Sequence, residues 1–393
     1  MQPHRQHARR GRWEIAASTV ATAAALFSGC ATSRVADDAA VRIHGVVVDS
    51  AGHGLSGVTV RLVKEADLGE ALAGLGAIAA TVGIACVSPS PPVVCQRART
   101  VTTGPDGGYA FDLRGADTKG TIGQASTVDV VVSYPGDAGA PGPSTTAGFQ
   151  VQTEDLPLPD LRPWTSPTSV TSSGDQLIVS AAPFVGDGSG GSPGLRTRIT
   201  DSASRELWSA GATGWHAEFD HRVLEDTIGT VHLEATTHLT APGTPVDMTY
   251  TTAPAGISGT GRAADSRHAT CAQVTAAGVT HRVTPSCPLT DGDLVTDAGA
   301  VLAGCPDCPP EAAHVVIDLG NSGVLSLVVV RGAPSVPLAV ESSEDGITWQ
   351  PYGTVSGPDA TTSPGHAAAR YVRVGRPADS LDLRGLIEVS AFR

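Results

Sequence analysis

Short runs in which apolar and polar residues alternate recur along the chain from about residue 40 onward. Residues 41–49 alternate and then become continuously apolar, and residues 58–63 repeat the alternation after a glycine-rich turn. Similar runs occupy residues 128–134, 231–235 and 324–331. Such alternation over about four to eight residues is typical of a strand with one buried face. The pattern therefore predicts an all-β fold.

Composition supports strands joined by turns, and the length allows several domains. The 393 residues include 46 glycines and 28 prolines, and only 4% of the chain is aromatic. Glycine and proline favour turns, and a chain of this length divides into about two to four domains. We therefore predict tandem β-sandwiches.

The net charge of −13 is strongly acidic, and the sequence has no cluster of basic residues interleaved with aromatic ones. An acidic surface repels phosphate backbones. No nucleic-acid partner is therefore predicted.

The first thirty residues have the three zones of an export signal. Four arginines precede an apolar segment at residues 15–27, and the small residues Ser28 and Gly29 precede Cys30. A basic start, a short apolar core and small residues at the cleavage point are typical of a signal peptide.

The run Leu26-Phe27-Ser28-Gly29-Cys30 resembles the lipobox of bacterial lipoproteins, although Phe27 stands where that family prefers leucine. The resemblance implies a signal peptide at residues 1–29, a covalent diacylglycerol on Cys30 with acyl chains such as palmitate, and a lipidated tether at residues 30–40. Acyl chains contribute about 0.8 kcal/mol per buried CH₂ and anchor a protein without a spanning helix. The implied location is extracytoplasmic, on the surface or the periplasmic face of a bacterial membrane. An ordinary signal peptide cut near Ala31 is the alternative.

Six cysteines remain after Cys30, and an even number in an exported chain favours disulfides. They are Cys86, Cys95, Cys271, Cys287, Cys305 and Cys308. Proximity favours pairing each with its neighbour in the sequence, without deciding the pairing. A redox-active pair at Cys305 and Cys308 and a four-cysteine zinc site are the alternatives.

Residues 41–162 form the first predicted domain. The strand residues 45–49, the turn and strand at 52–62, and the Asp106-Gly107-Gly108-Tyr109 turn resemble carboxypeptidase regulatory-like domains, which are transthyretin-like. The resemblance implies a seven-stranded sandwich that serves as a spacer or a binding platform. It carries no catalytic residue over to this chain.

An apolar insertion at residues 64–99 interrupts this first domain. Residues 71–87 lack any charge and fall just short of the roughly 20 residues that a membrane-spanning helix needs. We interpret the insertion as a helical hairpin closed by Cys86 and Cys95. A partner-binding or membrane-touching element is the alternative.

Residues 165–258 form the second predicted domain, after a proline-rich linker at residues 157–163. Its alternating runs resemble, at the level of pattern, a fibronectin type III or immunoglobulin-like sandwich with Trp208 or Trp215 as a core aromatic residue.

Residues 262–393 carry the most informative motifs. An Asp-Gly turn at residues 291–293 is followed by residues 315–320, which end in Asp-Leu-Gly, by Ser343-Glu344-Asp345-Gly346-Ile347-Thr348-Trp349, and by residues 369–374. In order and spacing these resemble the discoidin or coagulation-factor type C domain, a galactose-binding-like jelly roll. The resemblance implies binding of a glycan or another cell-surface ligand.

The same resemblance implies a structural Ca²⁺ at Asp293, Thr296 and Glu388, because hard oxygen ligands on a tight turn suit this ion. A turn without metal is the alternative. Trp349 and Tyr371 lie in strand motifs, and we predict that they belong to the core. The ligand would then contact the loops at residues 297–312, 332–336 and 353–368.

Three predicted sandwiches, a lipid anchor and no coherent set of catalytic groups indicate a non-catalytic binding protein. A structural spacer or a subunit of an envelope complex is the first alternative. An enzyme or a hydrolase accessory protein is the second.

Overall fold

The computed structural model is all-β, as predicted, and covers the three predicted domains with gaps. No helix in the part of the chain that it describes is long and apolar enough to cross a membrane. The signal peptide, Cys30, most of the 64–99 insertion, and Cys86, Cys95, Cys305 and Cys308 lie outside the described residues. The described residues are 34–65, 96–120, 125–136, 141–184, 193–202, 205–275, 280–294, 296, 298–303, 312–332, 337–356, 360–363, 367–375 and 385–393.

Two sheets face each other in the first segment. One has the order β4-β1-β7 and consists of β1 (Ala40–Val46), β4 (Gly108–Arg114) and β7 (Asp155–Pro157). The other has the order β3-β2-β5-β6 and consists of β2 (Thr59–Glu65), β3 (Gln96–Thr102), β5 (Thr127–Pro135) and β6 (Pro141–Gln150). A 3₁₀ turn, η3 (Gly115–Thr118), follows β4. The family likeness of this segment stays a prediction.

The middle segment also forms two layers. One sheet has the order β12-β9-β8 and consists of β8 (Ser169–Ser173), β9 (Gln176–Ser180) and β12 (His216–Asp220), which the 3₁₀ turn η5 (His221–Leu224) follows. The other layer consists of β10 (Gly194–Thr200), β11 (Glu206–Gly211), β13 (Ile228–Ala241), β14 (Thr244–Thr251) and β15 (Ala255–Ser258). Trp208 lies in the core, and Trp215 is half-buried against Trp164.

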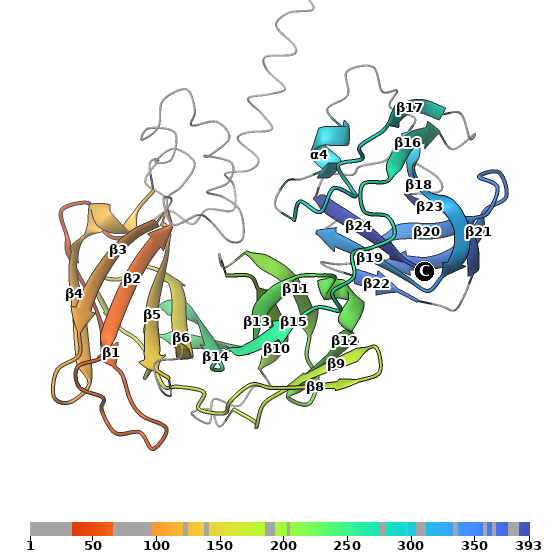
Figure 1. The fold of residues 1–393 in the computed structure, drawn as a ribbon. Coiled ribbons are helices and arrows are strands. Elements are labelled where there is room, and N and C mark those ends of the chain that lie inside the picture. The colour runs from red at the N-terminus through yellow and green to blue at the C-terminus, as the bar shows by residue number, and fades with distance from the viewer. Residues whose placement is uncertain are drawn as a thin grey trace, which may run out of the picture.

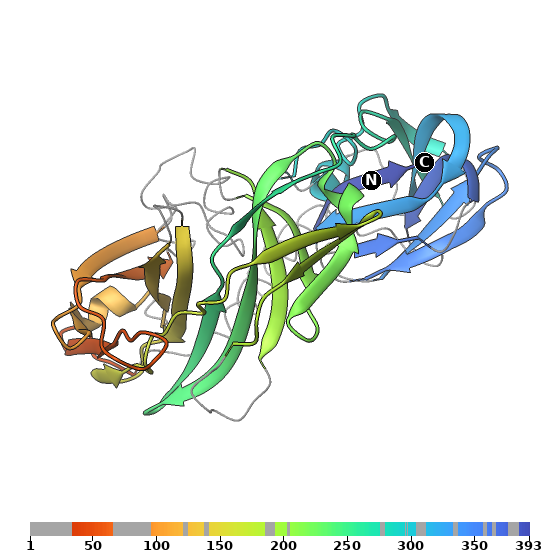
Figure 2. The ribbon, with the colours of Figure 1, turned by 60° about the horizontal axis from the view of Figure 1, so that its bottom comes forward.

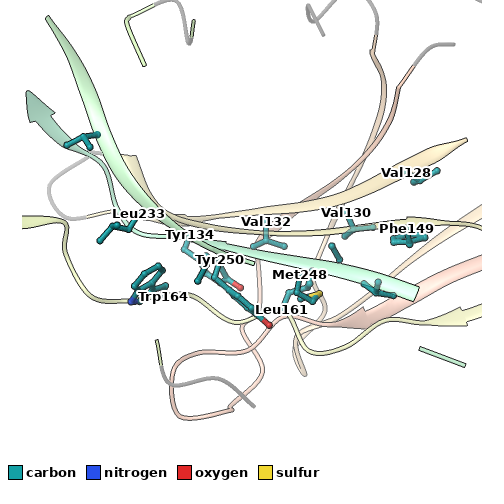
Figure 3. Close-up of a cluster of buried hydrophobic side chains, with 14 of the residues drawn as sticks. Val128, Val130, Val132, Tyr134, Phe149, Leu161, Trp164, Leu233, Met248 and Tyr250 are labelled. Atoms are coloured by element: carbon teal, nitrogen blue, oxygen red, sulfur yellow. The ribbon is translucent and has the colours of Figure 1, made fainter. Parts of the chain in front are cut away.

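The first and middle segments share one sheet. Strand β6 pairs antiparallel with β14, from Ser144 opposite Thr251 to Phe149 opposite Val246, so that β11-β10-β13-β14-β6-β5-β2-β3 runs without interruption (Figure 1, Figure 2). The core is shared as well, because Leu161 from the predicted linker and Trp164 directly after it pack beside Tyr250 (Figure 3). The segments therefore behave as one packed body, and the boundary between them stays a prediction.

The C-terminal segment is a sandwich of a six-stranded and a three-stranded sheet. The larger, of order β17-β16-β18-β23-β20-β21, consists of β16 (Thr270–Thr275), β17 (Thr280–Thr284), β18 (Ala312–Leu325), β20 (Leu338–Ser343), β21 (Gln350–Val355) and β23 (Ala367–Gly375). The smaller, of order β22-β19-β24, consists of β19 (Leu327–Gly332), β22 (Ala360–Thr362) and β24 (Leu386–Phe392). A short helix, α4 (Ala298–Ala303), contacts β24. The Cys271–Cys287 disulfide is present, as proximity indicated.

Strands β19 and β24 of the smaller sheet are buried on both faces, which explains the continuous apolar run of β19. Val328 and Val330 point into the core of the C-terminal sandwich. Leu327, Val329 and Phe392 belong instead to the core of the preceding segments. The C-terminal sandwich is thus docked through its small sheet, and not through the outer face of its six-stranded sheet.

Candidate functional site

A groove of about 380 Å³ lies on this outer face, across β16, β17, β18 and β23. Trp349 and Tyr371 line it together with four residues that carry charged or imidazole side chains, which are His314, Asp318, Asp345 and Arg373. We call it the sheet-face groove.

The alternation that builds the core also builds the groove. Along β18, Val315 and Ile317 are fully buried in the sandwich core, whereas His314 and Asp318 line the groove on the opposite face. Successive side chains of a strand point to opposite faces of its sheet. The pattern of β18 therefore fixes both sets of residues at once.

Trp349 and Tyr371 are half-buried and line the groove, so the prediction that they belong to the core is wrong. Tyr371 precedes the core residue Val372 on β23 and points to the outer face. Trp349 ends the turn before β21. Both rings lie beside guanidinium groups. The Cζ atom of Arg373 is 4.5 Å from the centre of the Trp349 ring, and that of Arg370 is 4.9 Å from the centre of Tyr371.

The turn before Trp349 is held by one carboxylate. Asp345 Oδ1 accepts hydrogen bonds from the backbone N–H groups of Thr348 at 2.7 Å and Ile347 at 2.8 Å, and Ser343 Oγ donates to it at 3.0 Å. These bonds lower the pKa of Asp345 to about 2. Gly346 follows with a φ of +74°, which favours glycine, and its Cα faces the Tyr371 ring. The Asp-Gly motif therefore positions both aromatic rings.

Two arginines beside the groove, Arg370 and Arg373, are paired with carboxylates. Arg370 donates two hydrogen bonds of 2.9 Å to Asp318, and this lowers the pKa of the Asp318 carboxyl. Arg373 Nε donates to Glu341 Oε2 at 2.5 Å. Bidentate and charge-assisted hydrogen bonds of this kind fix a guanidinium in place.

His314 is a buried polar residue in the wall of the groove, with 4% of its surface exposed. Burial lowers the pKa of its imidazole, and the charge of Arg373 lowers it further. Its Nδ1 atom has no hydrogen-bond partner among the described residues. The groove therefore contains a neutral imidazole beneath its surface.

Two exposed apolar side chains flank the groove. Val283 of β17 is 58% exposed and lines it, and Ile347 in the turn before Trp349 is 83% exposed. An exposed apolar surface beside half-buried aromatic rings is typical of a binding site.

The predicted calcium residues lie close together. Thr296 Oγ1 donates to Asp293 Oδ2 at 2.5 Å, and the backbone N–H of Gly292 donates to Glu388 Oε2 at 3.3 Å. No group of three or more histidine, cysteine or acidic residues in the described chain forms a metal cage. The structure thus brings the turn and Glu388 together, and the ion itself stays a prediction.

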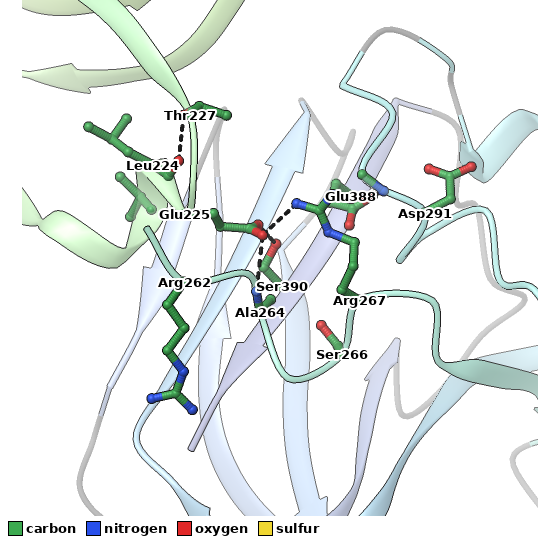
Figure 4. Close-up of polar contacts among 12 residues, drawn as sticks. Leu224, Glu225, Thr227, Arg262, Ala264, Ser266, Arg267, Asp291, Glu388 and Ser390 are labelled. Atoms are coloured by element: carbon green, nitrogen blue, oxygen red, sulfur yellow. Dashed lines mark hydrogen bonds and ion pairs between the residues drawn. The ribbon is translucent and has the colours of Figure 1, made fainter. Parts of the chain in front are cut away.

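Glu388 also belongs to a buried polar joint between the middle and C-terminal segments (Figure 4). Glu225, after η5, accepts hydrogen bonds from Arg267 at 2.6 Å, from Ser390 Oγ at 2.8 Å and from the backbone of Ala264 at 3.0 Å. Burial raises the pKa of Glu388 to about 8, and the nearby carboxylates of Glu225 and Asp291 add to this effect. Sequence reasoning missed this joint because its members come from distant parts of the chain.

A buried guanidinium, that of Arg331, strengthens the joint. Arg331 of β19 is 4% exposed and donates to the carbonyl oxygen of Leu207 at 2.5 Å and to that of Val223. Its Cζ atom also lies 5.6 Å from the centre of the Trp208 ring. These contacts fix the C-terminal sandwich on the middle segment.

Of the three loops predicted to contact a ligand, most of 297–312 and of 332–336 lies outside the described residues, whereas 353–368 is described in part and contains β22. The groove instead uses strand positions, and the signal that could have revealed it was the alternation of residues 314–318. In that stretch the polar residues His314 and Asp318 share the groove face with Val316, while Val315 and Ile317 belong to the core.

No known family model matches the chain. No curated protein matches it in sequence.

Among solved structures, the chain is similar to carbohydrate-binding modules. CBM32-1 from a family 31 glycoside hydrolase of Clostridium perfringens shares 13% identity at a TM-score of 0.18, covering 20% of this chain and 68% of the module. Chitosan-binding module 2 from a chitosanase/glucanase of Paenibacillus sp. IK-5, in complex with chitotriose, shares 15% identity at a TM-score of 0.23, covering 33% and 99%. The C-terminal domain of a chitobiase from Bacteroides fragilis shares 16% identity at 0.21, covering 28% and 79%. At these values the likeness assigns no family to the chain.

Proposed function

We propose that the chain is a non-catalytic binding protein whose C-terminal domain holds a glycan in the sheet-face groove. The observation that carries this proposal is the pair of half-exposed aromatic rings, Trp349 and Tyr371, in one groove with polar groups. A sugar ring has an apolar C–H face and hydroxyl groups around its edge. Aromatic rings match the first, and a few placed polar groups match the second.

The chemistry of the groove favours binding over catalysis. A hydrolase needs a free acid and a free base or nucleophile aimed at one bond. In the groove, Asp318 is held by Arg370, and Asp345 is held by the turn that it organises. Both carboxylates serve to position other residues.

Replacing Trp349 by alanine should abolish most glycan binding. An aromatic contact is worth about 0.5–1.5 kcal/mol beyond its buried area, so an affinity loss on the order of tenfold or more is expected. The measurement is a glycan array on the full chain, followed by calorimetric titration of the best neutral oligosaccharide. Chitotriose and GalNAc-β-1,3-galactose, which similar modules hold in their complexes, belong in the panel.

The matched control is Val301→Ala on α4, where Val301 is 56% exposed and does not line the groove. This variant should bind as the wild type does. If the wild type and the Trp349→Ala chain bind glycans with equal affinity, the sheet-face groove is not the binding site.

A rigid spacer is the second candidate, and one specific observation favours it. The shared sheet and the docked small sheet join all three segments into one body. A chain that binds nothing on a broad array, yet holds an envelope complex together, would support this alternative.

We further propose that Cys30 carries the lipid anchor and that the chain faces the extracytoplasmic side of a bacterial membrane. The lipobox-like run and the preceding basic and apolar zones support this proposal. A glycan receptor at that location would meet surface polysaccharides directly.

Calcium at Asp293, Thr296 and Glu388 remains part of the proposal and has its own test. A ligand that binds only the folded state stabilises it by about 2.7 kcal/mol at a hundredfold excess over Kd. Chelation of the full chain should therefore lower its melting temperature by several degrees, and Asp293→Ala should erase this dependence. Asp112→Asn, which removes an exposed carboxylate on β4, is the control. If chelator leaves the melting temperature of the wild-type chain unchanged, residues 291–293 form a turn that binds no calcium.

A further inference from the structure

We infer that the sheet-face groove selects uncharged glycans over anionic and cationic ones. The inference rests on the proposed function and concerns the ligand class of the same site. It is carried by the partners of the charged side chains that line the groove.

Both guanidinium groups beside the aromatic rings are already engaged. Arg373 donates to Glu341 at 2.5 Å and lies over the Trp349 ring. Arg370 donates two hydrogen bonds to the Asp318 carboxylate, one from Nε and one from Nη2. Each guanidinium is therefore paired with a carboxylate of the protein, so neither presents an uncompensated positive charge to a uronate or a sialic acid.

The carboxylates are engaged as well. Asp318 holds Arg370, and Asp345 accepts hydrogen bonds from two backbone N–H groups and from Ser343. A cationic sugar such as glucosamine would find both acids already satisfied by internal donors. The remaining titratable ring, His314, is neutral because burial lowers its pKa.

The surroundings also disfavour an anionic ligand. The whole chain carries a net charge of −13, and the groove is flanked by the apolar side chains Val283 and Ile347. A polyanion would meet a repulsive field, and the two described arginines beside the aromatic rings are already paired with carboxylates. An uncharged sugar loses no such interaction and gains the aromatic and apolar contacts.

Sugars of matched backbone and different charge test this directly on the full chain. N-acetylglucosamine oligomers are compared with their deacetylated, cationic counterparts, and galactose oligomers with galacturonate oligomers. We expect binding of a neutral member at least tenfold tighter than its charged partner. Its affinity should stay constant between about 20 mM and about 300 mM NaCl, because screening acts on charged pairs.

A variant that leaves the charge of Arg373 uncompensated supplies the second arm. Glu341→Gln removes the negative charge paired with this guanidinium but keeps an acceptor oxygen, so the variant should gain at least tenfold in affinity for galacturonate oligomers, and salt should weaken the gained binding. Glu344→Gln is the matched control, because Glu344 is exposed and its hydrogen bond is to Ser322. This control should retain the preference of the wild type.

The outcomes separate the two proposals. Tight, salt-sensitive binding of a charged oligomer by the wild type overturns the inference and leaves glycan binding intact. A Glu341→Gln chain with unchanged selectivity also overturns it. No binding to any glycan of a broad array overturns both.

Discussion

Replacing Glu225 by alanine should destabilise the chain by on the order of 3–5 kcal/mol, because breaking a buried ion pair leaves an uncompensated charge behind. Glu225 is 3% exposed and pairs with Arg267 at 2.6 Å. It also accepts hydrogen bonds from Ser390 and from the backbone of Ala264. Alanine would leave these three donors without their acceptor at the joint that holds the C-terminal sandwich.

The measurement is chemical unfolding of the full chain, combined with limited proteolysis at the joint. The variant should unfold at lower denaturant and release the C-terminal segment earlier. Glu218→Ala removes an exposed carboxylate from β12 in the same middle segment and should change neither result. If the Glu225→Ala chain unfolds at the same denaturant concentration as the Glu218→Ala chain and the wild type, the joint does not hold the segments together.

Replacing Cys30 by serine should move the protein from the membrane fraction to the soluble fraction almost completely. Two or three acyl chains anchor a protein stably, whereas a hydroxyl in place of the thiol accepts none. The described residues provide no spanning helix that could retain the chain. Fractionation of expressing cells, with Ser33→Ala in the tether as the control, measures the effect.

A Cys30→Ser chain that still sediments with membranes would contradict the anchor. Residues 71–87, the uncharged segment of the insertion, would then be the next candidate for membrane attachment. Deleting that segment in the Cys30→Ser background would separate the two sources of attachment.

The strand positions could be predicted because alternation is a local signal. Residues 41–46 and 128–134 form strands where the pattern placed them, and the buried set on each follows the period of two. The Cys271–Cys287 pair was also indicated by proximity alone. In these cases neighbouring residues carry the information.

The shared sheet could not be predicted, because it depends on a pairing between distant strands. Strands β6 and β14 are about a hundred residues apart, and neither sequence records which edge it will meet. Prolines at residues 157–163 indicated a linker. The apolar side chains between them, Leu158 and Leu161, pack into the core instead.

The outward direction of Trp349 and Tyr371 was missed for a different reason. A large aromatic residue in a strand motif is usually buried. Tyr371 instead shares the outer face of β23 with Arg373, and Trp349 lies in the turn before β21 and not on a strand. The groove therefore became visible only in three dimensions.

The double burial of β19 and β24 decides how the binding claim has to be tested. A fragment of residues 262–393 would expose Leu327, Val329 and Phe392, which the preceding segments now cover. Exposed apolar surface of this kind promotes association. Binding experiments therefore belong on the full chain.

The most direct test of the central claim is a crystal structure of the full chain with the neutral oligosaccharide that binds it most tightly. The account predicts a sugar ring in the sheet-face groove, in contact with Trp349 and Tyr371, while Arg373 stays paired with Glu341. A sugar bound at the loops of residues 332–336 or 353–368, with the groove empty, would contradict it.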